Sequence, residues 1–207
     1  MQSETGTIDY AKIKAIEGLT VIYTDEEYAF CKQFATDCYR KGVYKNQNNK
    51  TKIIVQHTLG KLAEIAVARL LHDHGCSEPD FAIGWEHAQF LPDLTLFPFN
   101  LHIKAVEPNV IYGTGFTFQY EKNKPHGKPR RDHIFESNDP IHDIVICCTV
   151  HRTIRMKNTI TIYDVNPWSV VKPLLCFDEM RDNIDLKDQK LFYHPLKSKE
   201  VMDVLRA

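Results

Sequence analysis

The chain has 207 residues, of which 43% are apolar, so it is long enough to bury a hydrophobic core and does not have the composition of a disordered protein. Its 26 lysines and arginines are balanced by 27 aspartates and glutamates, which excludes a global positive field; any attraction to nucleic acid must come from a local patch. Six cysteines without a C-x-x-C pair indicate neither a zinc ribbon nor a disulfide framework.

The N-terminal residues 1–14 lack the basic and then apolar pattern of a signal peptide. No apolar run approaches the ~20 residues that a membrane-spanning helix needs. We therefore expect a cytoplasmic protein with no membrane partner and with reduced thiols. Cys147 and Cys148 are neighbours in an apolar run, so they should point to opposite faces of one strand.

Two helices are expected in the first third of the chain. Residues 19–23 predict a short strand, after which Thr24 or Asp25 can cap a helix that continues to about residue 45. A second helix is expected to begin between residues 52 and 59 and to end at residue 74, because Gly75 suits a helix C-terminus.

From residue 81 the apolar period changes toward two, which is typical of strands. The continuous apolar run at 143–150 indicates a central strand buried on both faces. The segment 121–139 is rich in Lys, Pro, His and Asn and predicts a surface loop. The chain therefore has a mixed α/β order, with strands expected at 81–84, 92–97, 101–106, 116–120, 143–150 and 159–165.

Pro92-Asp93 and His102-Ile103-Lys104 fall on two adjacent predicted strands. Alternate residues of a strand share a face, so His102 and Lys104 should project together and Ile103 to the other side. A connecting loop with an even number of residues would put Asp93 on the face of His102.

Glu64 is the single charged residue of an apolar stretch in the second predicted helix. Burying its carboxylate without a partner would cost several kcal/mol, so a cation or hydrogen-bond donors should meet it. Two alternatives are an exposed Glu64 and an ion pair with Lys61 or Arg69.

The segment 60–64, Pro92-Asp93 and Lys104 together resemble the PD-(D/E)XK nuclease superfamily, and the similarity covers residues 52–165. The resemblance implies a restriction-endonuclease-like core that runs helix, three antiparallel strands, helix, strand, with a central mixed β-sheet flanked by helices. The chain would then be one nuclease-like domain, 1–207. Residues 1–50 would be an N-terminal helical extension, 52–165 the core and 166–207 a closing segment.

The function implied by this resemblance is metal-dependent hydrolysis of DNA phosphodiester bonds by an endonuclease of the restriction, phage or repair type. Its location would be the cytoplasm of a bacterial or phage-infected cell. Glu64 and Asp93 would bind Mg²⁺, while Lys104 would position the attacking water and stabilise charge on the phosphate. The expected partners are double-stranded DNA and, since many enzymes of this fold pair up to cut both strands, a second copy of the chain.

His102 stands where the superfamily usually carries an acid. Imidazole is a poorer ligand for Mg²⁺ and a better one for Mn²⁺. Three explanations remain open: His102 ligates the metal or activates water, a displaced acid such as Glu86 replaces the missing one, or the site has lost activity. The last would leave a nuclease-fold module that binds nucleic acid or a protein partner without cleaving anything.

A basic segment follows the strand predicted at 116–120 and suggests contact with a phosphate backbone. Gln119, at the end of that strand, is expected to contact nucleic acid as well and to reach toward the metal centre. The alternative is a solvated loop. The five positive residues are Lys122, Lys124, Lys128, Arg130 and Arg131.

Two rival sites compete with this interpretation. Pro79-Asp80 repeats the proline–aspartate pair, but it lies too early for the usual hairpin. His72 and His74 could belong to an unrelated histidine–metal hydrolase, although their predicted place at a helix end explains them without a metal.

Overall fold

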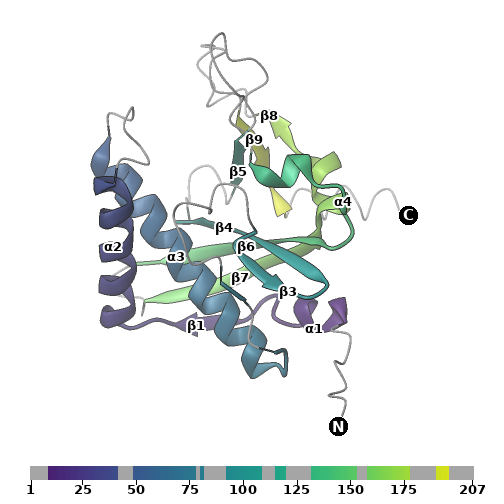
Figure 1. The fold of residues 1–207 in the computed structure, drawn as a ribbon, viewed down its shortest axis with the longest axis horizontal. Helices are drawn as coiled ribbons and strands as arrows, with labels where there is room; N and C mark the ends of the chain where they lie inside the picture. The colour runs from purple at the N-terminus through teal and green to yellow at the C-terminus, as the bar shows by residue number, and fades with distance from the viewer. Residues whose placement is uncertain are drawn as a thin grey trace.

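A mixed β-sheet lies at the centre of the fold in this computed structural model, which describes residues 9–41, 49–77, 80–81, 92–108, 115–119, 132–152, 158–177 and 190–195. Helices pack against the sheet, so the expected mixed α/β class is confirmed (Figure 1). The strands lie in the order β1 (Thr20–Ile22), β7 (Thr159–Pro167), β6 (Asp143–His151), β4 (Phe99–Val106), β3 (Leu94–Leu96) and β2 (Asp80–Phe81).

Helix α2 (Asp25–Arg40) begins where the sequence predicts it. The Thr24 side chain accepts a hydrogen bond from the Glu27 backbone, and the Glu27 side chain accepts one from the Thr24 backbone, which forms a complete capping box. Helix α3 (Lys50–Asp73) begins earlier than expected because Asn49 caps it by accepting from the Lys52 backbone at 3.0 Å. It ends as predicted, with Gly75 at φ +75°.

Helix α3 crosses one face of the sheet, and α2 packs beside α3 (Figure 1). The buried side chains between α3 and the sheet include Leu62, Val67, Ile103 and Cys148. Cys147 belongs instead to the core on the other face, so the two cysteines point in opposite directions, as predicted.

A second, smaller sheet covers part of the other face, in the order β5 (Phe116–Gln119), β9 (Lys190–Tyr193), β8 (Cys176–Phe177). Its core also holds Trp168 from the short helix α4 (Trp168–Val171) and Ile134 from η1 (His133–Glu136). The expectation of a surface loop over 121–139 is therefore wrong at Ile134, which is fully buried. Strands β8 and β9 were not predicted, since residues 166–207 were expected only as a closing segment.

Strands β3 and β4 form a hairpin with the two-residue loop Phe97-Pro98, whose peptide bond is cis. Strand β4 then pairs in parallel with β6. Strand β6 is buried on both faces, as its continuous apolar sequence predicts. The hairpin is what brings Asp93 back alongside β4.

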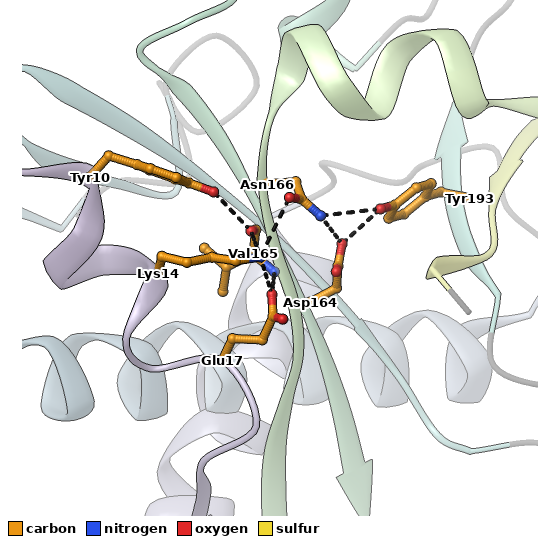
Figure 2. Close-up of polar contacts among 7 residues, drawn as sticks. All are labelled: Tyr10, Lys14, Glu17, Asp164, Val165, Asn166 and Tyr193. Atoms are coloured by element: carbon orange, nitrogen blue, oxygen red, sulfur yellow. Dashed lines mark hydrogen bonds and ion pairs between the residues drawn. The ribbon is translucent and has the colours of Figure 1, made fainter. Parts of the chain in front are cut away.

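Beyond β1, the edge of β7 is closed by the segment around α1 (Tyr10–Lys14) (Figure 2). The Glu17 carboxylate accepts a hydrogen bond from Val165 N at 2.9 Å, while Lys14 Nζ and Tyr10 Oη donate to Val165 O at 2.7 and 3.1 Å. These side chains satisfy backbone groups that an edge strand would otherwise expose. The N-terminal segment is thus part of the sheet structure as well as a helical extension.

Candidate functional site

Asp93 lies directly before β3. Beyond this point, no residue of β3 pairs with β4. The register pairs Leu94 with Leu101, and continuing it by one residue places Asp93 opposite His102. Asp93 N donates to Leu101 O at 3.0 Å, and Asp93 Oδ2 accepts from Ile103 N at 2.6 Å. The even-numbered loop thus gives the register parity on which the hairpin hypothesis depends, and the backbone of β4 fixes the carboxylate.

Glu64 lies on α3 and is largely buried, with 14% of its side chain exposed. It forms an ion pair with Lys61, one turn earlier on the same helix. Lys61 Nζ also lies 4.9 Å from the ring centroid of Phe34 on α2. The pairing with Lys61 is one of the alternatives that the sequence left open.

The carboxylates of Glu64 and Asp93 interact with each other. Burial and the negative charge of Asp93 raise the pKa of Glu64 to about 7, against the opposing effect of Lys61. Burial also raises the pKa of Asp93, although the hydrogen bond from Ile103 N and the charges of Lys104, His102 and Lys61 act in the opposite direction. Two acids from distant parts of the chain therefore share one poorly solvated environment.

Lys104 extends from the sheet face opposite α3, and its ammonium lies 4.8 Å from the ring centroid of Phe118. Its Nζ donates to Asp132 Oδ2 at 2.7 Å. Burial lowers the pKa of Lys104, but the charge of Asp132, the hydrogen bond to it and the charge of Asp93 outweigh burial and hold that pKa above its usual value. The charge of Asp93 thus acts on Glu64 and on Lys104, while the charges of Lys61 and Lys104 act on Asp93.

Asp132 is a member of this cluster that sequence reasoning missed. It lies immediately before η1, inside the segment expected to be a surface loop. Ile134 and Phe135 next to it are apolar, and their packing against the second core is what holds this segment near β4. The pattern Ile-Phe after a charged residue was the available signal that the segment turns inward.

His102 is buried on β4, and its Nε2 lies 3.1 Å from Asp143 Oδ1. Burial raises the pKa of Asp143, but hydrogen bonds from His102, Ser137 and Asn100, together with the charge of His102, bring that pKa below its ordinary value. This ring nitrogen is thus already bonded to a carboxylate. The metal-ligand role of His102 stays a prediction, and the bond to Asp143 competes with it.

The other sequence candidates are distributed as follows. Gln119 ends β5, but its side chain lies outside the described residues, as do Lys122, Lys124, Lys128, Arg130, Arg131 and Glu86. Asp80 pairs with Thr95 in the ladder between β2 and β3, and its side chain is likewise not described. His72 and His74 lie at the end of α3, and His74 Nδ1 is 2.8 Å from Leu70 O.

Within the described ranges, no group of three or more histidine, cysteine, aspartate or glutamate side chains surrounds a common point where an ion could sit. In the same residues, no helix combines the length and the apolar character needed to cross a membrane. No family model matches the chain, and comparisons with curated proteins and with solved structures likewise found no match.

Proposed function

We propose that this protein is a divalent-metal-dependent endodeoxyribonuclease with a restriction-endonuclease-like core. The observation that carries the proposal is the Asp93 carboxylate held against β4 by Ile103 N, from where its charge raises the pKa of both Glu64 on α3 and Lys104 on β4. Two acids, one of which acts on a fixed ammonium, are groups that metal-assisted phosphodiester hydrolysis can use.

The order of the elements also supports the proposal. Helix α3 is followed by the antiparallel strands β2, β3 and β4, and β6 then adds to β4 in parallel. The superfamily core has a helix between its third and fourth strands. Among the described residues of this connection, β5 and η1 occupy that position, which is a departure from the pattern.

The two acids fit a magnesium ion. Mg²⁺ is usually held by one or two carboxylates, with waters and substrate phosphates completing its shell. Glu64 and Asp93 would hold the ion, and an oxygen-only pair favours Mg²⁺ over softer metals, with Mn²⁺ as the alternative if His102 turns toward it. When bound, the ion would polarise the phosphate and lower the pKa of a water molecule.

The remaining work falls to the chain's own residues. Asp93 is held in place by Ile103 N, so its carboxylate is oriented before any ligand arrives. Lys104 would stabilise negative charge developing on the phosphate, since its ammonium is fixed by Asp132 and remains charged. Asp132 is therefore a positioning residue for Lys104 in this proposal.

Double-stranded DNA is the proposed substrate, on the basis of the sequence. The chain has a formal net charge of −1, so backbone contact would depend on local cations, and the segment from Lys122 to Arg131 supplies five within ten residues. A homodimer that cuts both strands is proposed by resemblance alone.

One observation favours a second candidate function, a nuclease-fold module that binds without cleaving. His102, in the place of the usual acid, is engaged by Asp143, and Lys104 is already paired with Asp132. Both contacts would suit a site whose residues stabilise the fold and no longer act on a substrate. The alternative predicts DNA binding or protein binding that is independent of Mg²⁺.

The experiment that separates the two is nicking of a supercoiled plasmid with Mg²⁺, Mn²⁺ or EDTA. We expect cleavage with either metal, and a loss of at least about 100-fold in Asp93→Asn, Glu64→Gln and Lys104→Met. Asp73→Asn, an exposed acid at the end of α3, is the matched control. Retention of wild-type cleavage by these three variants would overturn the assignment of the site, and binding without cleavage in both metals would favour the module.

A further inference from the structure

Lys61 is a buried cation in the candidate site to which the nuclease chemistry assigns no role. It forms the ion pair with Glu64, and only 17% of its side chain is exposed. Its ammonium also lies 4.9 Å from the ring centroid of Phe34, which encloses it from the side of α2. Lys61 is thus held in the site by contacts from two helices.

The charge of Lys61 reaches beyond its direct partner. It lowers the pKa of Glu64 and acts in the same direction on Asp93, against the effect of burial on both acids. Two neighbouring carboxylates in a poorly solvated environment repel each other and need a positive charge nearby. Lys61 supplies part of that charge.

A divalent cation held by Glu64 and Asp93 would compensate the negative charges of these two acids more strongly than Lys61 does. The carboxylate of Glu64 has a limited number of acceptor positions, and the ammonium and the metal ion would compete for them. Two like charges side by side in a buried site are unfavourable. Lys61 has a flexible four-carbon stem, so its head group can withdraw without a change in the helix backbone.

We propose that Lys61 is an internal counter-cation that occupies Glu64 when no metal ion is bound and is displaced when one binds. This inference rests on the proposed function, because it takes Glu64 and Asp93 as the metal ligands. It goes further in assigning the metal affinity of the site to a residue that binds neither the metal nor the substrate. If Glu64 binds no metal ion, in contrast, its ion pair with Lys61 would affect folding alone.

The test is calorimetric titration of the full chain with Mn²⁺, in the absence of DNA, for wild type, Lys61→Met and Lys61→Arg. We expect Lys61→Met to bind Mn²⁺ about three- to tenfold more tightly, because no internal cation must be displaced, and Lys61→Arg to remain near wild type. Lys52→Met, an exposed lysine in the first turn of the same helix, is the matched control and should leave the affinity unchanged.

Thermal unfolding with and without Mn²⁺ is the second measurement. Without metal, Lys61→Met should unfold at a lower temperature than wild type. On addition of Mn²⁺, its unfolding temperature should rise more than that of wild type. If Lys61→Met does not fold, Lys61→Gln, checked by circular dichroism, takes its place in both measurements.

The outcomes separate the two proposals. If wild type binds Mn²⁺, and Lys61→Met binds it no more tightly, the counter-cation inference is wrong while the proposed function stands. If neither protein binds Mn²⁺, the metal site itself is wrong and both proposals fail. If Lys61→Met binds Mn²⁺ more tightly than wild type, and the double variant Lys61→Met with Glu64→Gln no longer binds it, both proposals are supported.

Discussion

Asp93 Oδ2 accepts a 2.6 Å hydrogen bond from the backbone N–H of Ile103, and this contact fixes an acid on which the charges of Lys104 and Lys61 both act. The N–H is available because β3 begins only at Leu94, which pairs with Leu101, so no residue of β3 pairs with Ile103. The Asp93 carboxylate accepts the hydrogen bond from Ile103 N that the backbone of a neighbouring strand would otherwise accept. The geometry of the candidate site therefore depends on where the short strand β3 begins.

Asp93→Ala and Asp93→Asn should differ in stability because only the second keeps an acceptor for Ile103 N. Loss of the acceptor leaves a buried N–H unsatisfied, so we expect Asp93→Ala to be less stable than Asp93→Asn by about 1–3 kcal/mol. Both substitutions remove the charge of Asp93 that acts on Glu64, so this effect cancels in the comparison. Urea unfolding at pH 7 in EDTA measures the difference, and equal midpoints for the two variants would contradict the role given to this hydrogen bond.

Lys104→Met should abolish DNA cleavage, whereas Asp132→Asn should reduce it by only about 10- to 100-fold, as residues that orient a reacting group typically do. Asp132 holds the ammonium at 2.7 Å but does not act on the substrate in this proposal. The measurement is the nicking rate as a function of DNA concentration. Asp132→Glu, which can restore the ion pair, should recover part of the lost rate. No recovery, or an Asp132→Asn rate equal to wild type, would argue against a positioning role.

Tyr193→Phe should destabilise the protein through the contact between the two sheets. Tyr193 Oη donates to Asp164 Oδ2 at 2.7 Å, and Asn166 Nδ2 donates to the same oxygen at 2.7 Å (Figure 2). Both Asp164 and Tyr193 are fully buried, so losing one donor to the carboxylate should cost about 1.5–3 kcal/mol. Urea unfolding measures this cost, with Tyr39→Phe on α2 as the control; a loss equal to that of the control would show that the bond contributes little.

Local patterns were sufficient to predict most of the core. The Thr24 cap predicted where α2 begins, although the helix ends at Arg40 and not near residue 45, and the continuous apolar run predicted that β6 is buried on both faces. Alternation along a strand predicted that Ile103 faces away from Lys104, and the structure places Ile103 in the core under α3 and Lys104 against Phe118. Each of these features is set by residues close together in sequence, which is why sequence periodicity reveals them.

The features that sequence reasoning missed depend on partners far apart in the chain. The pairing of Lys104 with Asp132 requires the segment around η1 to fold back onto β4, and its many polar neighbours hid the two apolar residues that hold it there. The bond between His102 and Asp143 depends on the parallel pairing of β4 with β6. Strand β9 pairs with β5, far earlier in the chain, and with β8. Such contacts are decided by tertiary structure.

The stability of the metal-free protein should fall as the pH rises through the range in which Glu64 loses its proton. Burial and the charge of Asp93 raise the pKa of Glu64 from 4.5 to about 7 in the folded state. Between these values, the unfolded chain has released the proton and the folded chain retains it, so unfolding releases a proton and higher pH favours the unfolded state. The stabilisation is fully present below pH 4.5 and is lost as the pH rises toward and beyond 7. Asp93, whose pKa is also raised, adds a contribution of the same sign.

Comparison with Glu64→Gln isolates this effect, because the amide keeps the shape of the side chain and does not titrate. Urea unfolding in EDTA at pH 5, 6, 7 and 8 should show wild type losing on the order of 2–3 kcal/mol relative to Glu64→Gln across this range, since each pKa unit corresponds to about 1.4 kcal/mol. Glu26→Gln, an exposed acid in the first turn of α2, should instead follow the wild-type profile. Parallel profiles for wild type and Glu64→Gln would show that Glu64 is as well solvated in the folded protein as in the unfolded chain, and the buried acid pair would then have to be abandoned.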